Sequence, residues 1–378
     1  MAAYLDNAAT TKPCPEAIAA MMEAMESTYG NPSSLHSMGL QAQLLMEDAR
    51  KRIAGALACE PNSLIFTSGA TESNNLAILG AAAANGKRRR RTVVTTVEHA
   101  SVRNAFDQLE AQGFEVIRIT PNAQGEIDPD AFVAAVDENT CIASMMLVNN
   151  ETGAILPVRR ALYAAKRKYP HLITHCDAVQ GFMKLPFKVS ELTADLISVS
   201  AHKIHGVKGV GALYQKKGVR IAPLMFGGEQ EHRLRPGTES VPLIAAFGAA
   251  VTAMKASGPK RTERIRMLRE DCIRRLQEIK GIVLQIPADS SPYILSVAAE
   301  GLRAETLLHF LAEHDVYVSS GSACSKGKPS GVLRAFGIPD ALADSTIRLS
   351  FCPENTLYDN KRLAELIVQA QQQLIHKA

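Results

Sequence analysis

The sequence of 378 residues lacks the features of several large classes of protein. No apolar run approaches the length of a membrane-spanning helix, and the first residues show no basic stretch followed by an apolar one. The net charge of +4 is too small to indicate a nucleic-acid partner. We therefore expect no membrane span, no signal peptide and no direct binding to nucleic acid.

Cysteine is scarce, and its pattern excludes two kinds of stabilisation. The seven cysteines are odd in number and contain no Cys-x-x-Cys pair, so neither a disulfide framework nor a zinc site is expected. Their scatter fits the reducing environment of the cytoplasm. Most free cysteines are buried and inert, and we expect this of six of the seven. These are Cys14, Cys59, Cys141, Cys176, Cys272 and Cys352.

The composition is that of an ordinary globular protein, with 46% hydrophobic and 21% charged residues, and the length allows two domains. From residue 64 onward, apolar runs typical of strands alternate with helical patterns. This alternation predicts an α/β fold with a mostly parallel sheet flanked by helices. A Ser-Gly-Pro break at residues 257–259 marks the expected boundary. We expect a large domain of residues 12–257 and a smaller α+β domain of residues 1–11 and 258–378.

The most informative stretch covers residues 195–211. An apolar strand pattern at residues 196–199 turns polar at Ser200, His202 and Lys203, and three glycines follow within eight residues. A lysine held at the end of a buried strand, beside glycines that allow close approach, is well placed for chemistry. A lone motif of this kind is also compatible with a solvated strand end. Lysine forms Schiff bases with carbonyl compounds, among them pyridoxal phosphate (PLP).

Other predicted strand ends carry the groups that PLP requires. The sequence Ser68-Gly-Ala-Thr71 lies between a strand and a helix and offers free N–H groups and a hydroxyl to a phosphate. Asp177 could keep the pyridine nitrogen protonated, Gln180 or Asn150 could donate to the phenolic oxygen, and His99 could lie over the ring. Caps and turns use the same residue types, so each signal is weak alone. Their order on successive strand ends is the stronger signal.

A second unusual segment, residues 318–331, surrounds Cys324 with small and polar residues. Cys324 therefore does not fit the pattern of a core cysteine. Lys326 and Lys328 favour the thiolate, which is the reactive form. The glycines of the segment permit loop motion, which suggests a nucleophile that travels.

These motifs resemble those of the cysteine desulfurases of the NifS/IscS kind, which are class V, fold-type I PLP enzymes. The resemblance covers nearly the whole chain. It includes Ser200-Ala-His-Lys203 and Ser320-Gly-Ser-Ala-Cys324, together with residues 4–11, 30–34, 67–75, 98–99, 149–153, 177–180, 235–238 and 347–350.

The resemblance implies catalytic roles for three residues. Lys203 would bind PLP covalently, and His99 would stack on the cofactor ring and move protons. Cys324 would attack the sulfur of bound L-cysteine, release alanine and carry a persulfide to a sulfur-acceptor protein. The pathway served would be iron-sulfur cluster assembly or tRNA thiolation in the cytoplasm.

The resemblance also implies a binding set and a homodimer. The binding residues would contact the phosphate, the pyridinium, the phenolic oxygen or the substrate carboxylate. The phosphate would be held by Ala70, Thr71, Ser200 and His202, with Thr238 reaching in from a partner subunit; Asp177 would pair with the pyridinium, Gln180 with the phenolic oxygen, and Asn150 and Arg348 with the substrate carboxylate or the ring oxygen.

Three features depart from the family pattern. The loop after Cys324 is shorter than in the housekeeping members, which bears on the acceptor it serves. Residues 349–354 replace an expected Gly-Arg-Phe run, and His205 and Val207 replace a Tyr and a Pro.

Other readings remain open: a selenocysteine lyase, another class V transferase such as an aminotransferase, or a scaffold that only binds partners. An aminotransferase needs no mobile cysteine, and a scaffold needs neither Lys203 nor Asp177.

Overall fold

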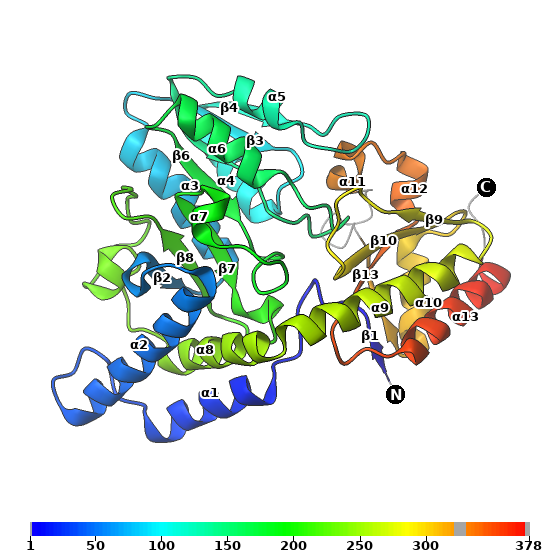
Figure 1. The fold of residues 1–378 in the computed structure, drawn as a ribbon, viewed down its shortest axis with the longest axis horizontal. Helices are drawn as coiled ribbons and strands as arrows, with labels where there is room; N and C mark the ends of the chain where they lie inside the picture. Colours follow the sequence, from blue (N-terminus) through cyan, green and yellow to red (C-terminus); the bar gives the residue numbers. More distant parts are fainter. Residues whose placement is uncertain (1, 321–329, 375–378) are drawn as a thin grey trace.

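The computed structural model describes residues 2–320 and 330–374. It contains a seven-stranded sheet and a four-stranded sheet that lie beside each other, joined along one side by long helices (Figure 1). A further pair of short strands, β1 (Ala3–Tyr4) and β11 (Val316–Tyr317), runs parallel and brings the N-terminus to the four-stranded sheet's side of the molecule. This arrangement confirms the predicted α/β fold with a smaller α+β part.

The seven-stranded sheet is parallel except for one strand. Strand β8 runs antiparallel to both of its neighbours, and the remaining pairs are parallel. The carboxyl ends of the other six strands therefore lie at one edge, together with the start of β8. In order across the sheet the strands are β2 (Leu64–Thr67), β8 (Gly211–Gln215), β7 (Leu196–Ser200), β6 (Ile173–Asp177), β5 (Thr140–Ser144), β3 (Arg91–Thr95) and β4 (Glu115–Ile119).

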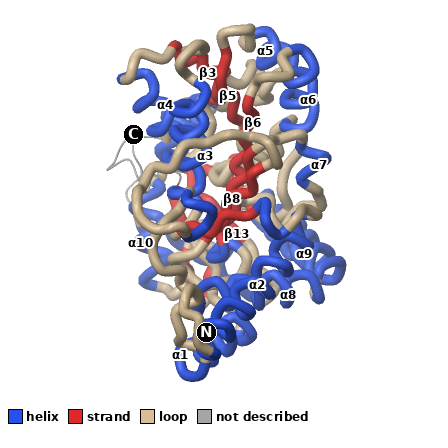
Figure 2. The backbone as a smooth tube through the Cα atoms, turned by 90° about the vertical axis from the view of Figure 1, so that its left-hand side faces the viewer, coloured by secondary structure: helices blue, strands red, loops and turns tan. Residues whose placement is uncertain are grey.

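Helices cover both faces of this sheet, which explains why its central strands carry few exposed residues. Every residue of β5, β6 and β7 is buried, as expected for parallel strands between two helical layers. Figure 2 shows α3 (Ala70–Asn85) and α4 (Ala100–Ala111) on one side of the strands. On the other side lie α5 (Pro129–Ala134), α6 (Val158–Lys168) and α7 (Val189–Leu192).

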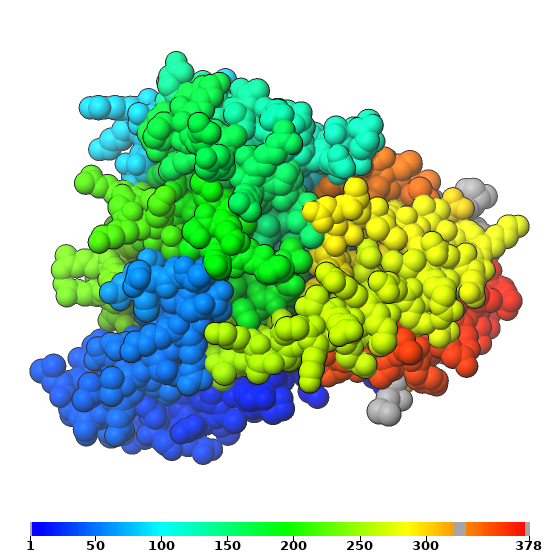
Figure 3. All heavy atoms as spheres, viewed as in Figure 1, coloured from blue at the N-terminus to red at the C-terminus, as the bar shows by residue number. Residues whose placement is uncertain are grey.

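The four-stranded sheet is antiparallel throughout. It is packed with the helices α9 (Gly258–Gln277), α10 (Ala304–Glu313) and α13 (Leu357–Gln373), and the short helices α11 (Gly331–Ala335) and α12 (Asp340–Asp344) lie beside it. The space-filling view shows this yellow-to-red part against the green part of the first sheet (Figure 3). Its strands, in order, are β12 (Ser319–Ser320), β13 (Thr346–Ser350), β10 (Ile294–Ala299) and β9 (Ile282–Gln285).

The remaining helices form a layer below the first sheet. The helices α1 (Pro15–Ser27) and α2 (Ser37–Leu57) both pack on α8 (Val241–Ala256), which is mostly buried. Within the described ranges, no single helix has both the length and the apolar composition to cross a membrane. The helices α8 and α9 pass that test only as a pair bent by 75°.

Some elements have boundaries that the sequence analysis did not define. Helix α2 begins at Ser37, where the His36 ring accepts a hydrogen bond from the Gly39 N–H and caps the first turn. The helices α11 and α12 were not predicted, since five residues are too few to display a helical period. Cys324 and most of its loop lie outside the described residues.

Candidate active site

The carboxyl edge of the seven-stranded sheet opens into a cavity of about 640 Å³, which we call the central cavity. It gathers the predicted site residues from six separate segments of the described chain, and residues 8–10 of the N-terminal segment complete its wall. The predicted residues that line it are Ala70, Thr71, His99, Asn150, Asp177, Gln180, Ser200, His202, Lys203 and Arg348.

Lys203 ends the short 3-10 helix η2 (Ala201–Lys203), which directly follows β7. Its Nζ donates to the carbonyls of Ala8 and Ala9, at 2.7 and 2.6 Å. Burial and, after it, the positive charge of Arg348 lower the pKa of Lys203 to about 8. A substantial share of the amine is therefore neutral near physiological pH and able to attack a carbonyl.

Asp177, at the end of β6, is buried and held by two donors. The Asn74 Nδ2 donates to its Oδ2 at 2.8 Å, and the Val179 N–H donates to its Oδ1 at 3.0 Å. Asn74 lies in the first turns of α3 and was not among the predicted site residues. Its place one helical turn after Ala70 is the signal that could have marked it.

His99 caps the N-terminus of α4, and its ring is open to the central cavity. The Ser101 N–H donates to Nδ1 at 3.2 Å, so this nitrogen is an acceptor and the neutral ring carries its proton on Nε2. Desolvation lowers the pKa of His99, against an opposing effect of Asp177. Ser101 Oγ bonds to both His99 and Asn74, at 2.8 and 2.9 Å, which links His99 to the Asp177 network.

The predicted phosphate-binding turn lies between β2 and α3. Ala70 and Thr71 form the first turn of α3, whose N–H groups have no partner within the helix. Ser200 is buried, and its Oγ has no hydrogen-bond partner among the described residues. The chain packs closely here, since a Cβ on Gly211 would stand 2.9 Å from the Gly69 Cα. Buried hydroxyls are normally paired, so the free Ser200 Oγ indicates a place for an external acceptor.

His202 and Arg348 complete the polar wall. Burial and, next, the charge of Lys203 lower the pKa of His202 to about 4, so its ring is neutral. The Arg348 guanidinium donates to Asp6 Oδ1 at 2.8 Å and to the Asn150 carbonyl at 2.9 Å, while its Nε is buried with no partner in the described chain. Much of the Arg348 fork is therefore engaged by the protein itself.

Glu98, the residue before His99, is fully buried beside this cavity. Its Oε1 accepts from Thr95 Oγ1 at 2.6 Å and from the Met146 N–H at 2.8 Å, and its Oε2 has no partner in the described chain. Burial raises the pKa of this carboxyl to about 8. The group is therefore largely protonated at neutral pH, a property that the sequence did not reveal.

The residues of the central cavity fit PLP. The cavity is lined by an amine with a lowered pKa, by a carboxylate held by two donors, and by a helix N-terminus beside an unpaired hydroxyl. Lys203 would hold the cofactor aldehyde, Asp177 the pyridine nitrogen, and Ser200 with the first turn of α3 the phosphate.

Comparison with known proteins finds relatives along nearly the whole chain. A family model described as Aminotransferase class-V matches residues 3–363. A NifS/IcsS protein homolog of Lactobacillus delbrueckii subsp. bulgaricus is 40% identical over 359 residues, covering 94% of this chain and 93% of that protein. The Cysteine desulfurase IscS of Methanosarcina thermophila is 37% identical over 376 residues, covering 99% and 93%. The chain belongs to the cysteine desulfurase family.

A solved structure named NIFS-LIKE PROTEIN supports this membership, with a TM-score of 0.94, 35% identity and coverage of 99% of this chain and 100% of that chain. Members of the cysteine desulfurase family and of the class V aminotransferases are PLP enzymes. The requirements that the central cavity meets are thus those of the family's own cofactor.

The six cysteines in the described part of this desulfurase family member are four buried ones and two that are half-buried. The six described cysteines are free, and burial raises the pKa of each of their thiols. Cys14 and Cys59 are only half-buried, so the prediction of full burial is wrong for these two. A raised pKa suppresses the thiolate, so none of the six is suited to act as a nucleophile.

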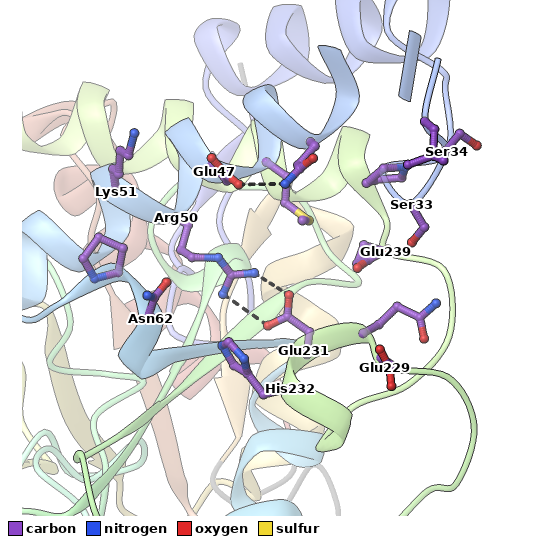
Figure 4. A pocket seen from close by; sticks show the side chains of 16 residues that line it. Ser33, Ser34, Glu47, Arg50, Lys51, Asn62, Glu229, Glu231, His232 and Glu239 are labelled. Atoms are coloured by element: carbon purple, nitrogen blue, oxygen red, sulfur yellow. Dashed lines mark hydrogen bonds and ion pairs between the residues drawn. The ribbon is translucent and has the colours of Figure 1, made fainter. Parts of the chain in front are cut away.

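A larger cavity of about 850 Å³ lies away from this chemistry, between α2 and residues 229–239. Figure 4 shows Arg50 and Glu231 pointing toward each other across it. Glu231 also accepts from the Phe66 N–H at 2.8 Å, so the ion pair supports β2 just before the predicted phosphate-binding turn. No predicted site residue in the described ranges lines this cavity, and Thr238 is exposed near it rather than in the central cavity of its own chain.

Proposed function

We propose that this protein uses PLP to convert L-cysteine to L-alanine and to carry the released sulfur as a persulfide on Cys324. The observation that carries the proposal is the convergence of Lys203, Asp177 and Ser200 on the central cavity. Each side chain meets one demand of the cofactor, and they come from different elements. A chance arrangement of all three side chains around one cavity explains this convergence less well than a PLP site does.

When bound, PLP supplies an electron sink that makes the bonds at the substrate Cα and Cβ labile. The side chains of the central cavity would bind substrate and move protons. Asn150 and Arg348 would hold the substrate carboxylate, and the buried Arg348 Nε is a free donor for it. The Lys203 amine, once released, would take the proton from Cα. His99, with its proton on Nε2, would pass protons at the cavity wall.

The sulfur step would use a cysteine thiolate. The Cys324 sulfur would form a bond to Sγ of the substrate as the Cβ–Sγ bond breaks, and the electron pair left on carbon would take up a proton, giving alanine. The six described cysteines are poor candidates because their thiol pKa values are raised. Lys326 and Lys328 follow Cys324 closely in the sequence and would favour its thiolate.

The persulfide requires a destination, and we propose a sulfur-acceptor protein of iron-sulfur cluster assembly or tRNA thiolation. A cytoplasmic location is supported by the free state of the six described cysteines. We also propose a homodimer in which Thr238 reaches the phosphate of the second subunit. The exposure of Thr238 away from its own central cavity supports this.

The proposed division into domains follows the sheets. All strands of the seven-stranded sheet come from residues 12–257, and those of the four-stranded sheet come from residues 258–378. The pairing of β1 with β11 supports the assignment of residues 1–11 to the smaller domain.

Absorption and product assays test the proposed function. The purified protein, loaded with PLP, is expected to absorb in the visible and to form alanine and sulfide from L-cysteine in the presence of a thiol reductant. Lys203→Ala should abolish both signals, whereas Lys217→Ala, an exposed lysine on the turn after β8, should retain them. A Lys203→Ala variant with full turnover would overturn the proposal.

A further inference from the structure

A second lysine, Lys184, lies buried behind the central cavity and has no assigned role. It follows β6 by seven residues, at the end of the turn of residues 179–184 that contains Gln180. Its residue exposure is 7%. Burying an ammonium is costly unless it is paired, and no carboxylate of the described chain forms an ion pair with Lys184. A lysine retained under these conditions calls for an explanation.

The polar contact of Lys184 is with the side chain of Gln180. Its Nζ donates to Gln180 Oε1 at 3.0 Å. The Nζ also lies 5.7 Å from the ring centre of Tyr293, at the edge of β10. The Tyr293 hydroxyl accepts from Arg261 Nε at 3.2 Å, which fixes the ring. Lys184 is therefore held between the ring and the Gln180 amide.

The other end of the Gln180 amide faces the central cavity. Its Nε2 donates to the Ala8 carbonyl at 2.9 Å, and the same carbonyl accepts from Lys203 at 2.7 Å. A chain of hydrogen bonds thus runs from Lys184 through Gln180 and Ala8 to Lys203. An amide nitrogen has two N–H groups, so the second remains for a ligand in the central cavity, which Gln180 lines.

We propose that Lys184 is a positioning residue that fixes the orientation of the Gln180 amide, with its oxygen turned away from the central cavity and its N–H groups turned toward it. The inference rests on the proposed function, because the N–H group has a task only if it meets the phenolic oxygen of PLP. A flipped amide would place Oε1 against the Ala8 carbonyl and against that oxygen, both of them acceptors. The lysine ammonium opposes the flipped form because it has only donors, and the Ala8 carbonyl opposes it because it can only accept.

The ionisation of Lys184 is consistent with this role. Burial and, next, the charge of Lys203 lower the pKa of Lys184 to about 7. Below pH 7 the ammonium therefore has only donors, and at pH 8 the mostly neutral amine still donates to Gln180 Oε1 while its field on Lys203 is weak. The charged or titratable groups that act on Lys184, or on which it acts, are Lys203, Arg348, Arg261, His202 and His205.

The first test compares Lys184→Met with Lys217→Met in the PLP-loaded protein. The readout is the pH midpoint of the visible band, which reports the proton on the Lys203 nitrogen in its link to the cofactor. Without an oriented N–H donor the phenolic oxygen is a poorer anion, so the proton is held more tightly. The midpoint should rise by about one pH unit, equal to a tenfold change in the proton equilibrium. Lys217→Met should leave it unchanged, and Lys184→Arg, which keeps the donors, should have a midpoint close to that of the parent.

A double-mutant cycle separates orientation from a direct charge effect. In a Gln180→Leu background, Lys184→Met should shift the midpoint far less than in the parent, because Lys184 then has no side-chain amide to orient. A shift of the same size in both backgrounds would overturn the proposal, as would an unchanged midpoint in Lys184→Met itself.

A measurement on the cofactor-free protein covers the case in which Lys184→Met fails to fold. The side-chain amide resonances of Gln180, assigned by their loss in Gln180→Leu, should shift between pH 6 and pH 8 as Lys184 titrates. Resonances that do not move over this range would contradict the contact. If the proposed function itself were wrong, the parent protein would develop no visible band after incubation with PLP, which distinguishes that outcome from an error in the role of Lys184.

Discussion

Two buried groups of opposite chemistry at the central cavity share a pKa of about 8. Burial lowers the pKa of the Lys203 amine and raises that of the Glu98 carboxyl, because it disfavours the charged form of each. At physiological pH the Glu98 carboxyl is therefore mostly neutral, and a substantial share of the Lys203 amine is neutral. For Lys203 this creates a nucleophilic amine, and for Glu98 it creates a protonated carboxyl at the wall of the central cavity.

The amine of Lys203 sets the pH dependence of cofactor loading. Only the neutral amine attacks an aldehyde, so the rate at which the cofactor-free protein forms the visible band with PLP should rise with pH and level off above about pH 8. An ordinary lysine would continue to gain rate toward pH 10.5. Arg348→Met should move the midpoint upward, because the charge that helps to lower the pKa is removed and Asp6 is left unpaired. Stopped-flow absorbance measures both, and a parent profile without a midpoint near 8 would contradict the assignment.

The carboxyl of Glu98 sets a pH dependence of stability. Its pKa in the folded chain, about 8, lies above the ordinary value of 4.5, so folding favours its protonated form. The associated stability is fully present below about pH 4.5 and is lost as the pH rises toward 8. Glu98→Gln keeps an acceptor for Thr95 and Met146 without this ionisation.

Thermal unfolding checks this account of Glu98. The melting temperature of Glu98→Gln, relative to the parent, should increase between pH 5 and pH 8.5. A difference that stays constant over this range would show that the carboxyl does not titrate there.

At the scale of elements, the close approach of β8 to the phosphate-binding turn explains a glycine. A Cβ on Gly211 would stand 2.8 Å from the Val199 carbonyl oxygen and 2.9 Å from the Gly69 Cα, and backbone atoms cannot move aside cheaply. Gly211→Ala should therefore lower the free energy of unfolding by about 1–3 kcal/mol and weaken PLP binding by displacing the turn.

Gly55 is the matched control for Gly211. It lies exposed within α2, and a Cβ there meets nothing within 4 Å. Gly55→Ala should raise the free energy of unfolding by about 0.5–1 kcal/mol, because alanine favours the helix. Denaturant unfolding of both variants measures the contrast, and equal effects would refute the argument from close packing.

The strands were predictable from sequence, whereas several of their neighbours were not. Strands β5, β6 and β7 are short, rich in β-branched and apolar residues, and end in polar residues, and their alternation with helices predicts that Asp177 and Lys203 lie at one edge. The reversed direction of β8 has no signal in its own residues. Asn74 and Asp177 are 103 residues apart and meet only because α3 packs over β6.

Across the whole molecule, the N-terminal segment also makes contacts that the sequence alone does not predict. The sequence predicts a short extended lead-in at residues 4–11, but not that its carbonyls hold the Lys203 amine. Asp6 and Arg348 are 342 residues apart and form an ion pair, which ties the first residues to β13 beside the central cavity. Contacts of this sequence separation follow from the folded topology rather than from any local pattern.

The central claim is that Cys324 carries the sulfur, and single-turnover persulfide labelling tests it most directly. The PLP-loaded protein is incubated with L-cysteine, alkylated and mapped by mass spectrometry. The parent and Cys352→Ser should carry a persulfide on Cys324, because the Cys352 thiol is buried and its pKa is raised to about 12. Cys324→Ser should bind PLP and L-cysteine, seen as a spectral change, yet carry no persulfide and release little sulfide. A persulfide on Cys352, or a Cys324→Ser variant that desulfurates cysteine as fast as the parent, would contradict the account.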